Sequence, residues 1–347
     1  MDRKYGVGVV GIGLVGSEMV KVLEQRNFPA REIKIFATRE REEEINGKKY
    51  KVEIANDNSF KGLDVVLFAG TEGSKGASKQ WGWKAVESGA YVIDNGDDFR
   101  MDGRCPLVVP EVNAHHLSKD KKFIANPNCS TIQMVVALAP LHRYSKIKRI
   151  VVSTYQSVSG TGRAGVRELY EQSKETADSY PDIKVVKTKP AAYPHQIAFN
   201  VIPQISGISE DPAFSNYYKE EIKMVKETRK ILDAPGLKIT ATCVRVPVFS
   251  AHSESINVEF EKKITAAQAR EILSQAPGVV LMDLPEKSIY PMPLAIGGKD
   301  ETFVGRIRED VSCANALDLW VVADNVRKGA ALNAVQIAET LISKKLL

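Results

Sequence analysis

The chain has 347 residues, of which 44% are hydrophobic and 26% charged, with a formal net charge of +5. These values argue against disorder, and the length suits two domains of ordinary size better than one small core. No basic block is interleaved with aromatic residues, and no apolar run approaches the roughly 20 residues of a membrane span, so we expect a cytoplasmic protein without nucleic-acid or membrane partners.

The first third of the chain alternates apolar strands with helical segments. Near-continuous apolar runs predict strands at 5–13, 32–38, 63–70, 90–96 and 107–113. Helical spacing of the apolar residues between these runs indicates a doubly wound sheet covered by helices. We therefore predict an α/β fold whose Rossmann-type dinucleotide-binding domain comprises residues 1–130 and, at the end of the chain, 326–347.

A glycine-rich sequence directly follows the first predicted strand. Gly11, Gly13 and Gly16 form a GxGxxG pattern at the start of a predicted helix. The first glycine permits a tight turn, the second lets a pyrophosphate approach the backbone, and the third lets helix pack on strand. The helix N-terminus favours the phosphate charge. We expect this loop, with Leu14 and Val15, to bind a dinucleotide; the alternative is a tight turn without a ligand.

The end of the second predicted strand favours one dinucleotide over the other. NAD enzymes carry an acidic residue about 20 residues beyond the glycines, whereas this strand is followed by Thr38 and Arg39. An arginine there can pair with a 2′-phosphate. We therefore expect NADP(H) as the cofactor, with Thr38 and Arg39 in contact with it. Glu40 is close enough to serve ribose hydroxyls, and Arg39 could instead be a solvated loop residue.

Cys129 lies between an Asn-Pro-Asn turn and an apolar helical segment. Pro127 cannot continue a strand ladder and Asn128 is a good N-cap, so Cys129 is expected among the first helical residues. The positive end of the helix dipole lowers the pKa of a thiol there, which suits a nucleophile. The alternative is a cysteine buried as a small hydrophobe. We expect that alternative for the other three cysteines, Cys105, Cys243 and Cys313.

The remainder of the chain follows a different pattern. Alternation of apolar and polar residues predicts strands at 147–159, 238–249, 254–262 and 303–310. Such alternation is typical of a mostly antiparallel sheet with one solvated face. Helices are expected at 163–178, 216–232, 265–275 and 314–342. We assign residues 131–325 to an α+β domain for substrate binding and dimerisation.

Six motifs in order along the whole chain resemble those of the aspartate-β-semialdehyde dehydrogenase family. They are the glycine-rich start, NPNCST, YQSVSG, EEIKMVKET, RVPVFSAHSES and DNVRKGAALNAVQIAE. The resemblance implies an NADP-dependent phosphorylating aldehyde dehydrogenase of lysine, threonine and methionine biosynthesis. Such an enzyme reduces L-aspartyl 4-phosphate to L-aspartate 4-semialdehyde through a cysteine thioester, as a homodimer or homotetramer. The glycine loop GIGLVG is one residue shorter than the family's usual GxxGxxG, which leaves its cofactor contacts open.

The resemblance also implies roles for individual residues. Cys129 matches the nucleophile, His252 the general acid/base, and Gln156 the residue that orients substrate near the thiol. The substrate-binding positions are Asn128, Arg245 as clamp on the substrate carboxylate, Arg100 and Lys223 as the phosphate-binding pair, and Glu220 as partner of the substrate amino group. Further cofactor contacts match Ser159, Gly160 and Asn325, and no metal is implied.

Two other functions stay open at this point. An N-acetyl-γ-glutamyl-phosphate reductase, or another acyl-phosphate reductase, would use the same cysteine and histidine on a different substrate. A non-catalytic nucleotide-binding paralogue is the second alternative, but it would have no need to retain Cys129 together with Arg245 and His252. Arg245 and His252 are an odd number of residues apart, so they converge only if the chain bends between them.

Overall fold

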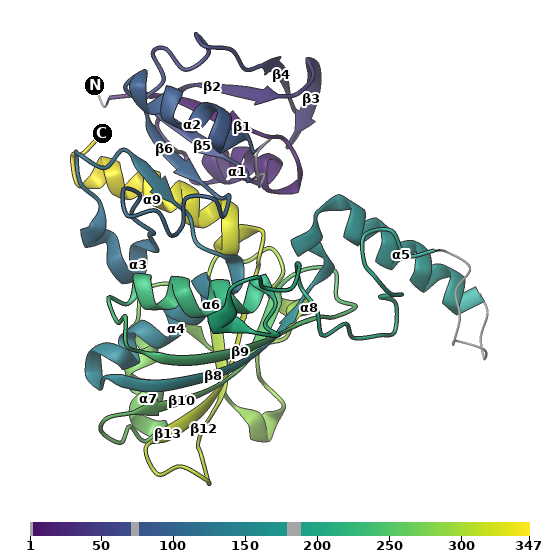
Figure 1. The fold of residues 1–347 in the computed structure, drawn as a ribbon, viewed down its shortest axis with the longest axis vertical. Helices are drawn as coiled ribbons and strands as arrows, with labels where there is room; N and C mark the ends of the chain where they lie inside the picture. Colours follow the sequence, from purple (N-terminus) through teal and green to yellow (C-terminus); the bar gives the residue numbers. More distant parts are fainter. Residues whose placement is uncertain (1–2, 71–75, 179–188) are drawn as a thin grey trace. The chain divides into compact units, whose positions relative to one another are not determined.

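The computed structural model describes residues 3–70, 76–178 and 189–347 (Figure 1). The chain divides into two compact units, one formed by Met1–Cys129 with Gly329–Leu347 and the other by Ser130–Lys328. Each unit is built on one sheet. In the described part of the chain, no helix has both the length and the apolar character of a membrane span.

The first unit contains a seven-stranded sheet in the order β3-β4-β2-β1-β5-β6-β7. Its strands are β1 (Tyr5–Val10), β2 (Ala30–Ala37), β3 (Arg41–Ile45), β4 (Lys48–Ile54), β5 (Val65–Phe68), β6 (Tyr91–Asp94) and β7 (Phe123–Ala125). The named pairs are parallel except for the hairpin β3–β4. All residues of β1, β5 and β6 are buried, which explains why their sequences are apolar on both faces.

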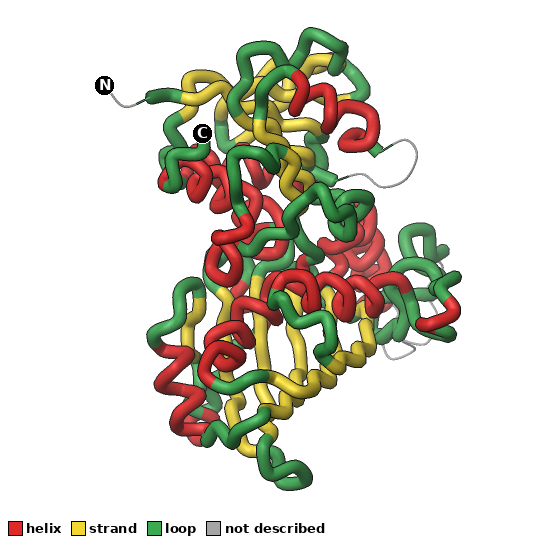
Figure 2. Tube along the Cα trace, turned by 60° about the vertical axis from the view of Figure 1, so that its left-hand side comes forward, coloured by secondary structure: helices red, strands yellow, loops and turns green. Residues whose placement is uncertain are grey.

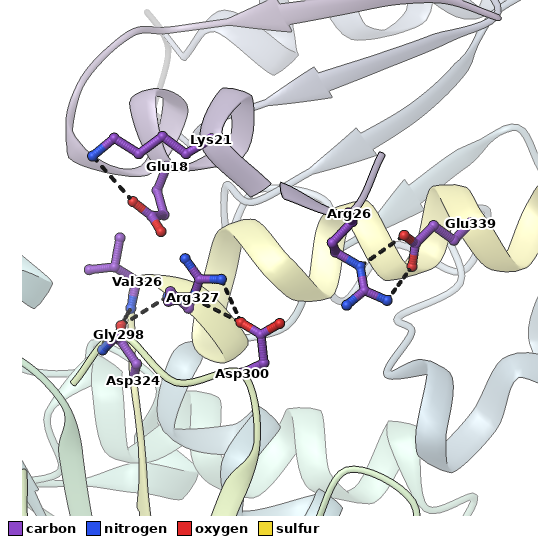
Figure 3. Close-up of polar contacts among 9 residues, drawn as sticks. All are labelled: Glu18, Lys21, Arg26, Gly298, Asp300, Asp324, Val326, Arg327 and Glu339. Atoms are coloured by element: carbon purple, nitrogen blue, oxygen red, sulfur yellow. Dashed lines mark hydrogen bonds and ion pairs between the residues drawn. The ribbon is translucent and has the colours of Figure 1, made fainter. Parts of the chain in front are cut away.

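Helices cover both faces of this sheet. They are α1 (Leu14–Gln25), α2 (Ala77–Glu87), the short α3 (Pro110–Asn113) and α9 (Leu332–Ser343). Side chains of α1 and α9, such as Leu23 and Ile337, share one apolar core with β1. The opposite core contains Phe68 and Phe123, packed against α2. A bidentate ion pair with N–O distances of 2.8 Å joins Arg26 beside α1 to Glu339 of α9 (Figure 3).

The second unit contains a six-stranded sheet in the order β11-β12-β13-β10-β8-β9. Its strands are β8 (Ile147–Gln156), β9 (Lys238–Arg245), β10 (His252–Phe260), β11 (Val279–Leu281), β12 (Thr302–Glu309) and β13 (Ala316–Ala323). Three of the five pairings are antiparallel, and β8–β9 and β11–β12 are parallel. The predicted fold class, a Rossmann-type domain joined to an α+β domain with a mostly antiparallel sheet, is confirmed.

The helices of the second unit are α4 (Cys129–Tyr144), α5 (Arg163–Asp178), α6 (Lys219–Ile231), α7 (Ala266–Ser274) and the short α8 (Pro293–Ile296). Helices α4, α6 and α7 pack on one face of the sheet, as the helical segments in Figure 2 show, and bury residues such as Leu138, Met224 and Leu273. The opposite face is partly exposed. The tilted rings of Tyr155 and Trp320 contact each other on it, with centroids 5.4 Å apart.

Two expected elements are wrong. Residues 107–113 form no strand, because only Leu107 bridges to Ala125 and Pro110 then begins α3. The expected helix at 314–342 is instead the strand β13 followed by a π-helical turn, Arg327–Ala331, and then α9. The charged segment after β2 also folds as the hairpin β3–β4, which the composition of that segment did not suggest.

Candidate active site

The glycine loop has the geometry that dinucleotide binding needs. Gly11 adopts a φ of +91°, a backbone conformation that side chains disfavour. A Cβ on Gly16 would lie 1.9 Å from the carbonyl oxygen of Gly11, so only glycine lets α1 pack this close to the turn. A Cβ on Gly13 would meet nothing within 4 Å. Gly13 is therefore not required for packing, and its bare backbone remains open to a ligand.

The start of α1 also fits an anionic group. Its N-cap, Gly13, offers no side-chain hydrogen bond, and the first turn, which includes Leu14 and Val15, holds no acidic residue. The N–H groups of that turn are therefore without a side-chain cap. Thr38 and Arg39 directly follow the adjacent strand β2, and both are exposed. The C-terminal ends of β1 and β2 thus place the glycine loop and Arg39 at the same edge of the sheet.

Buried amides anchor the loop that leads into Cys129. The Asn126 side chain donates to Oδ1 of Asn95 over 2.6 Å and accepts from the Asn333 amide over 2.7 Å. Nε of Arg100 donates to the carbonyl oxygen of Asn126 over 3.0 Å. The buried Asn128 follows, and α4 begins at the partly exposed Cys129. Cys129 is thus the first residue of the helix, as the sequence predicts.

His252 is the first residue of β10 and is fully buried. Its Nδ1 accepts the backbone N–H of Ser157 over 3.0 Å, and Ser157 Oγ also lies 3.0 Å from Nδ1. Because Nδ1 is an acceptor, the neutral ring carries its proton on Nε2. Among the described residues, Nε2 has no hydrogen-bond partner. Burial, assisted by the charge of Arg245, holds the pKa of His252 well below its usual range.

Arg245 lies beside this imidazole at the end of β9. One of its terminal nitrogens donates to the carbonyl oxygen of Ser157 over 2.6 Å, which fixes the guanidinium. The chain does bend between Arg245 and His252, where Ala251 has a φ of +66°. Arg245 ends β9 and His252 begins β10, and both of these strands pair with β8. The bend and this shared neighbour let two residues at an odd spacing converge.

The buried Gln156 connects β8 to α6. It pairs in register with Arg245 on the neighbouring strand, and its Nε2 donates to Oε1 of Glu220 over 3.2 Å. The other oxygen of Glu220 lies 3.7 Å from Nζ of Lys223, one turn along α6. Glu220 is 6% exposed and Lys223 17% exposed at the side chain, so this is not an ordinary solvated surface pair.

Gly160 lies close to the imidazole of His252 and to the guanidinium of Arg245. A Cβ at this position would lie 3.3 Å from Nε2 of His252 and 2.8 Å from a terminal nitrogen of Arg245. Gly160 itself is exposed. A side chain at this position would therefore crowd the only nitrogen of His252 that carries a proton.

Asn325 ties three segments of this site together. Its Oδ1 accepts from Oγ of Ser157 at 3.1 Å, from Oγ of Ser159 at 3.0 Å and from the backbone N–H of Ala251 at 3.1 Å. The neighbouring Asp324 holds the chain in place by accepting the N–H groups of Gly298, Val326 and Arg327 (Figure 3). An ion pair of 2.6 Å between Arg327 and Asp300 completes this support.

The structure thus groups the predicted residues by unit. The second unit brings together Gln156, Ser159, Gly160, Glu220, Lys223, Arg245, His252 and Asn325. The first unit places the glycine loop, Thr38, Arg39, Arg100, Asn128 and Cys129 at the ends of its parallel strands. The sequence reasoning missed Ser157 and Asn126, although each lies within a quoted motif beside a residue that it singled out.

Comparison with known proteins gives matches over nearly the whole chain. Residues 6–120 match the family model described as semialdehyde dehydrogenase, NAD binding domain, and residues 138–328 match that of the semialdehyde dehydrogenase dimerisation domain. These matches and the site geometry define a two-domain oxidoreductase that acts on an aldehyde.

Individual relatives narrow this class. The chain is 50% identical to the aspartate-semialdehyde dehydrogenase of Aquifex aeolicus over 99% of both chains, and 44% identical to that of Bacillus subtilis over 98% of both. A crystal structure of aspartate semialdehyde dehydrogenase II from Vibrio cholerae matches with a TM-score of 0.90 at 43% identity, covering 98% of this chain and 99% of that chain. The chain belongs to the aspartate-semialdehyde dehydrogenase family, as its motifs predict.

Proposed function

We propose that the protein reduces L-aspartyl 4-phosphate to L-aspartate 4-semialdehyde with NADPH and releases inorganic phosphate. The observation that carries this proposal is the buried His252, whose proton-bearing Nε2 lies beside Gly160 and Arg245 and has no hydrogen-bond partner among the described residues. A relative from V. cholerae with 42% identity has a structure complexed with ASA. This supports the four-carbon semialdehyde over the longer acetylated substrate of a γ-glutamyl-phosphate reductase.

Cys129 supplies the nucleophile in this mechanism. Its thiolate attacks the acyl carbon of the substrate, a carbon–sulfur bond forms, and the acyl carbon–oxygen bond breaks as phosphate leaves with its electron pair. The product of this step is a thioester on Cys129. The dinucleotide, when bound, supplies the hydride that reduces this thioester to a thiohemiacetal. Collapse of the thiohemiacetal releases the aldehyde and regenerates the thiolate.

His252 acts on the oxygen of both tetrahedral species. Because its Nε2 carries the proton, it donates a hydrogen bond to the developing oxyanion during thiolate attack and again during reduction. The thiohemiacetal alkoxide keeps this hydrogen bond until it collapses to the aldehyde and the Cys129 thiolate, so the imidazole stays neutral throughout. Its lowered pKa keeps it in this form between turnovers.

The charged residues orient the substrate. Arg245, held by the Ser157 carbonyl, is suited to a bidentate grip on the substrate carboxylate. Glu220 would receive the amino group, and Lys223 with Arg100 would bind the phosphate. Asn128 and Gln156 would position the reacting acyl group. These assignments give each substrate charge a partner of opposite sign.

The cofactor assignment follows from the first unit and from one edge of the second. We assign the pyrophosphate to the glycine loop and the 2′-phosphate to Thr38 and Arg39, which makes NADP(H) the cofactor. Ser159, Gly160 and Asn325 would contact the nicotinamide end. The match to a dimerisation domain supports a homodimer built on the second unit.

A phosphate-dependent assay tests the proposed function. Purified protein should reduce NADP when given L-aspartate semialdehyde and phosphate, and should do so far less with N-acetylglutamate semialdehyde. Alkylation of thiols or Cys129→Ser should abolish turnover while NADPH binding stays measurable. Turnover without phosphate, or full activity of Cys129→Ser, would refute the mechanism.

A further inference from the structure

Glu254 is a buried acid that the mechanism above does not use. It lies two residues after His252 on β10, hence on the same face of the strand. Its exposure is 0%, and among the described residues neither carboxyl oxygen makes a hydrogen bond of normal geometry. A carboxylate with neither a cation nor a hydrogen-bond donor at such a site would be strongly unfavourable.

The side chain beside Glu254 is Gln133 of α4. Gln133 is fully buried, and its Nε2 donates to the backbone carbonyl oxygen of His252 over 3.4 Å. Its Oε1 has no hydrogen-bond partner among the described residues. The Oε1 of Gln133 is thus an acceptor that lacks a donor. One proton on Glu254 would supply that donor and remove the charge from the carboxyl, because a carboxylic acid can donate to an amide oxygen.

The other surroundings of Glu254 also favour a neutral acid. Across the sheet it pairs with Thr154 of β8 on one side and Val321 of β13 on the other. Beyond Thr154 lies the Cys243 thiol, whose pKa is raised by burial. In the described part of the chain, no cation shifts the pKa of Glu254.

Acids of α6 act on Cys243. Glu220 and Glu221 raise the pKa of the Cys243 thiol. Burial raises the pKa of Glu254 well above its usual range, and the neighbouring Gln133 amide only partly opposes this shift.

We propose that Glu254 is a carboxylic acid that donates a hydrogen bond to Gln133, and that this bond holds the Gln133 amide on the His252 backbone. Glu254 and Gln133 are then positioning residues for His252. The inference rests on the proposed function, since it assumes that His252 acts on the substrate oxygen. Gln133 lies one helical turn after Cys129 on α4. The helix that begins at the proposed nucleophile therefore also carries the residue that contacts the first residue of β10, His252.

Three single variants and one double variant test this arrangement. Glu254→Leu removes the donor and should lower kcat by about 30-fold while KM for the semialdehyde changes less than about twofold, because small displacements of a catalytic group are costly. Gln133→Leu should have the same effect, and the double variant should be no worse than either single one. Glu254→Gln should restore kcat to within about threefold of wild type, because an amide N–H can also donate to Gln133.

The pH dependence of kcat distinguishes a positioning role from a merely structural one. The ionisation of His252 in the kcat profile should shift in Glu254→Leu and Gln133→Leu and return in Glu254→Gln. If Glu254→Gln is as impaired as Glu254→Leu, the acid is needed in its charged form and the proposal is overturned. Wild-type kcat in both leucine variants would overturn it as well.

Infrared spectroscopy decides the protonation state without relying on activity or on the leucine variants folding. The difference spectrum between wild type and Glu254→Gln at neutral pH should contain the carbonyl band of a protonated carboxylic acid. A carboxylate band in its place overturns the proposal. Absence of phosphate-dependent NADP reduction by the wild-type enzyme would instead refute the proposed function, and the infrared result would still stand.

Discussion

Ser157 donates its backbone N–H to Nδ1 of His252 over 3.0 Å, and this bond fixes which nitrogen of the imidazole carries the proton. A backbone N–H cannot reverse its role, unlike a hydroxyl. His252 therefore presents Nε2–H as a hydrogen-bond donor, and Ser157 directly follows Gln156, the side chain proposed to orient the substrate. The following predictions test this site and the loop that would bind the cofactor.

Gly160→Ala should displace Nε2 of His252 and the guanidinium of Arg245. The added methyl would lie 3.3 Å from Nε2 and 2.8 Å from a nitrogen of Arg245, so both side chains must move. We expect kcat to fall about 100-fold, the loss typical of a misplaced catalytic group. Gly207→Ala is the matched control in the same unit, because its methyl would meet nothing within 4 Å. Steady-state kinetics that show equal kcat for both variants would contradict this view of Gly160.

Two glycines of the loop should respond differently to the same substitution. Gly16→Ala should lower the free energy of unfolding by about 3 kcal/mol, because the methyl would collide with the Gly11 carbonyl. Gly13→Ala meets no such obstacle and should keep its stability within about 0.5 kcal/mol. It should nevertheless weaken NADPH binding, since the methyl occupies the space proposed for the pyrophosphate. Urea unfolding and fluorescence titration measure the two effects; unaltered NADPH affinity in Gly13→Ala would remove the loop from the cofactor site.

Arg39 should determine the preference for NADPH over NADH. Arg39→Ala removes the proposed partner of the 2′-phosphate, and we expect the ratio of kcat/KM values for the two cofactors to fall about 100-fold, a loss of roughly 3 kcal/mol for a charge-assisted pair. The value for NADH itself should hardly change. Arg41→Ala is a suitable control, because Arg41 is exposed and already pairs with Glu43 over 2.8 Å. A cofactor ratio that responds equally to both variants would refute the assignment.

Asp94 should make stability depend on pH. Burial raises the pKa of this carboxyl to about 6, whereas it titrates near 4 in the unfolded chain. The contribution of protonated Asp94 to the free energy of unfolding is fully present below about pH 4. It is lost as pH rises to about 6, because over that range the unfolded chain releases the proton first. Asp94→Asn removes this loss and should gain about 1–2 kcal/mol over wild type between pH 4.5 and pH 7. Urea unfolding at both pH values measures the gain, and a difference independent of pH would contradict it.

Local features of the fold could be predicted from the sequence, and pairings between distant strands could not. The roles of Gly11 and Gly16 follow from one turn and one close contact, both of which lie within the motif. The hairpin β3–β4 turns at Asn46 and Gly47, with φ angles of +52° and +75°. Such an Asn-Gly pair is a strong hairpin signal, but the strands expected from the sequence did not include this charged segment. Strand β13 was mistaken for a helix because a short apolar run fits both periods, and its pairing with β10 decides between them.

The supporting contacts of the site are beyond sequence reasoning for a similar reason. Ser157 and His252 are 95 residues apart, and Gln133 and His252 are 119 apart. No local pattern encodes such contacts, because they arise only when β8 and α4 both pack on β10. The catalytic candidates themselves could be named from motifs, whereas the residues that orient them required the structure.

The most direct test of the mechanism is to trap the acyl group on Cys129. The enzyme is mixed with NADP and L-aspartate semialdehyde in the absence of phosphate, and NADPH formation and protein mass are followed. We predict a burst of one NADPH per subunit and an aspartyl group on the peptide that contains Cys129, released when phosphate is added. No burst, or an adduct elsewhere with Cys129 unmodified, would contradict the covalent mechanism.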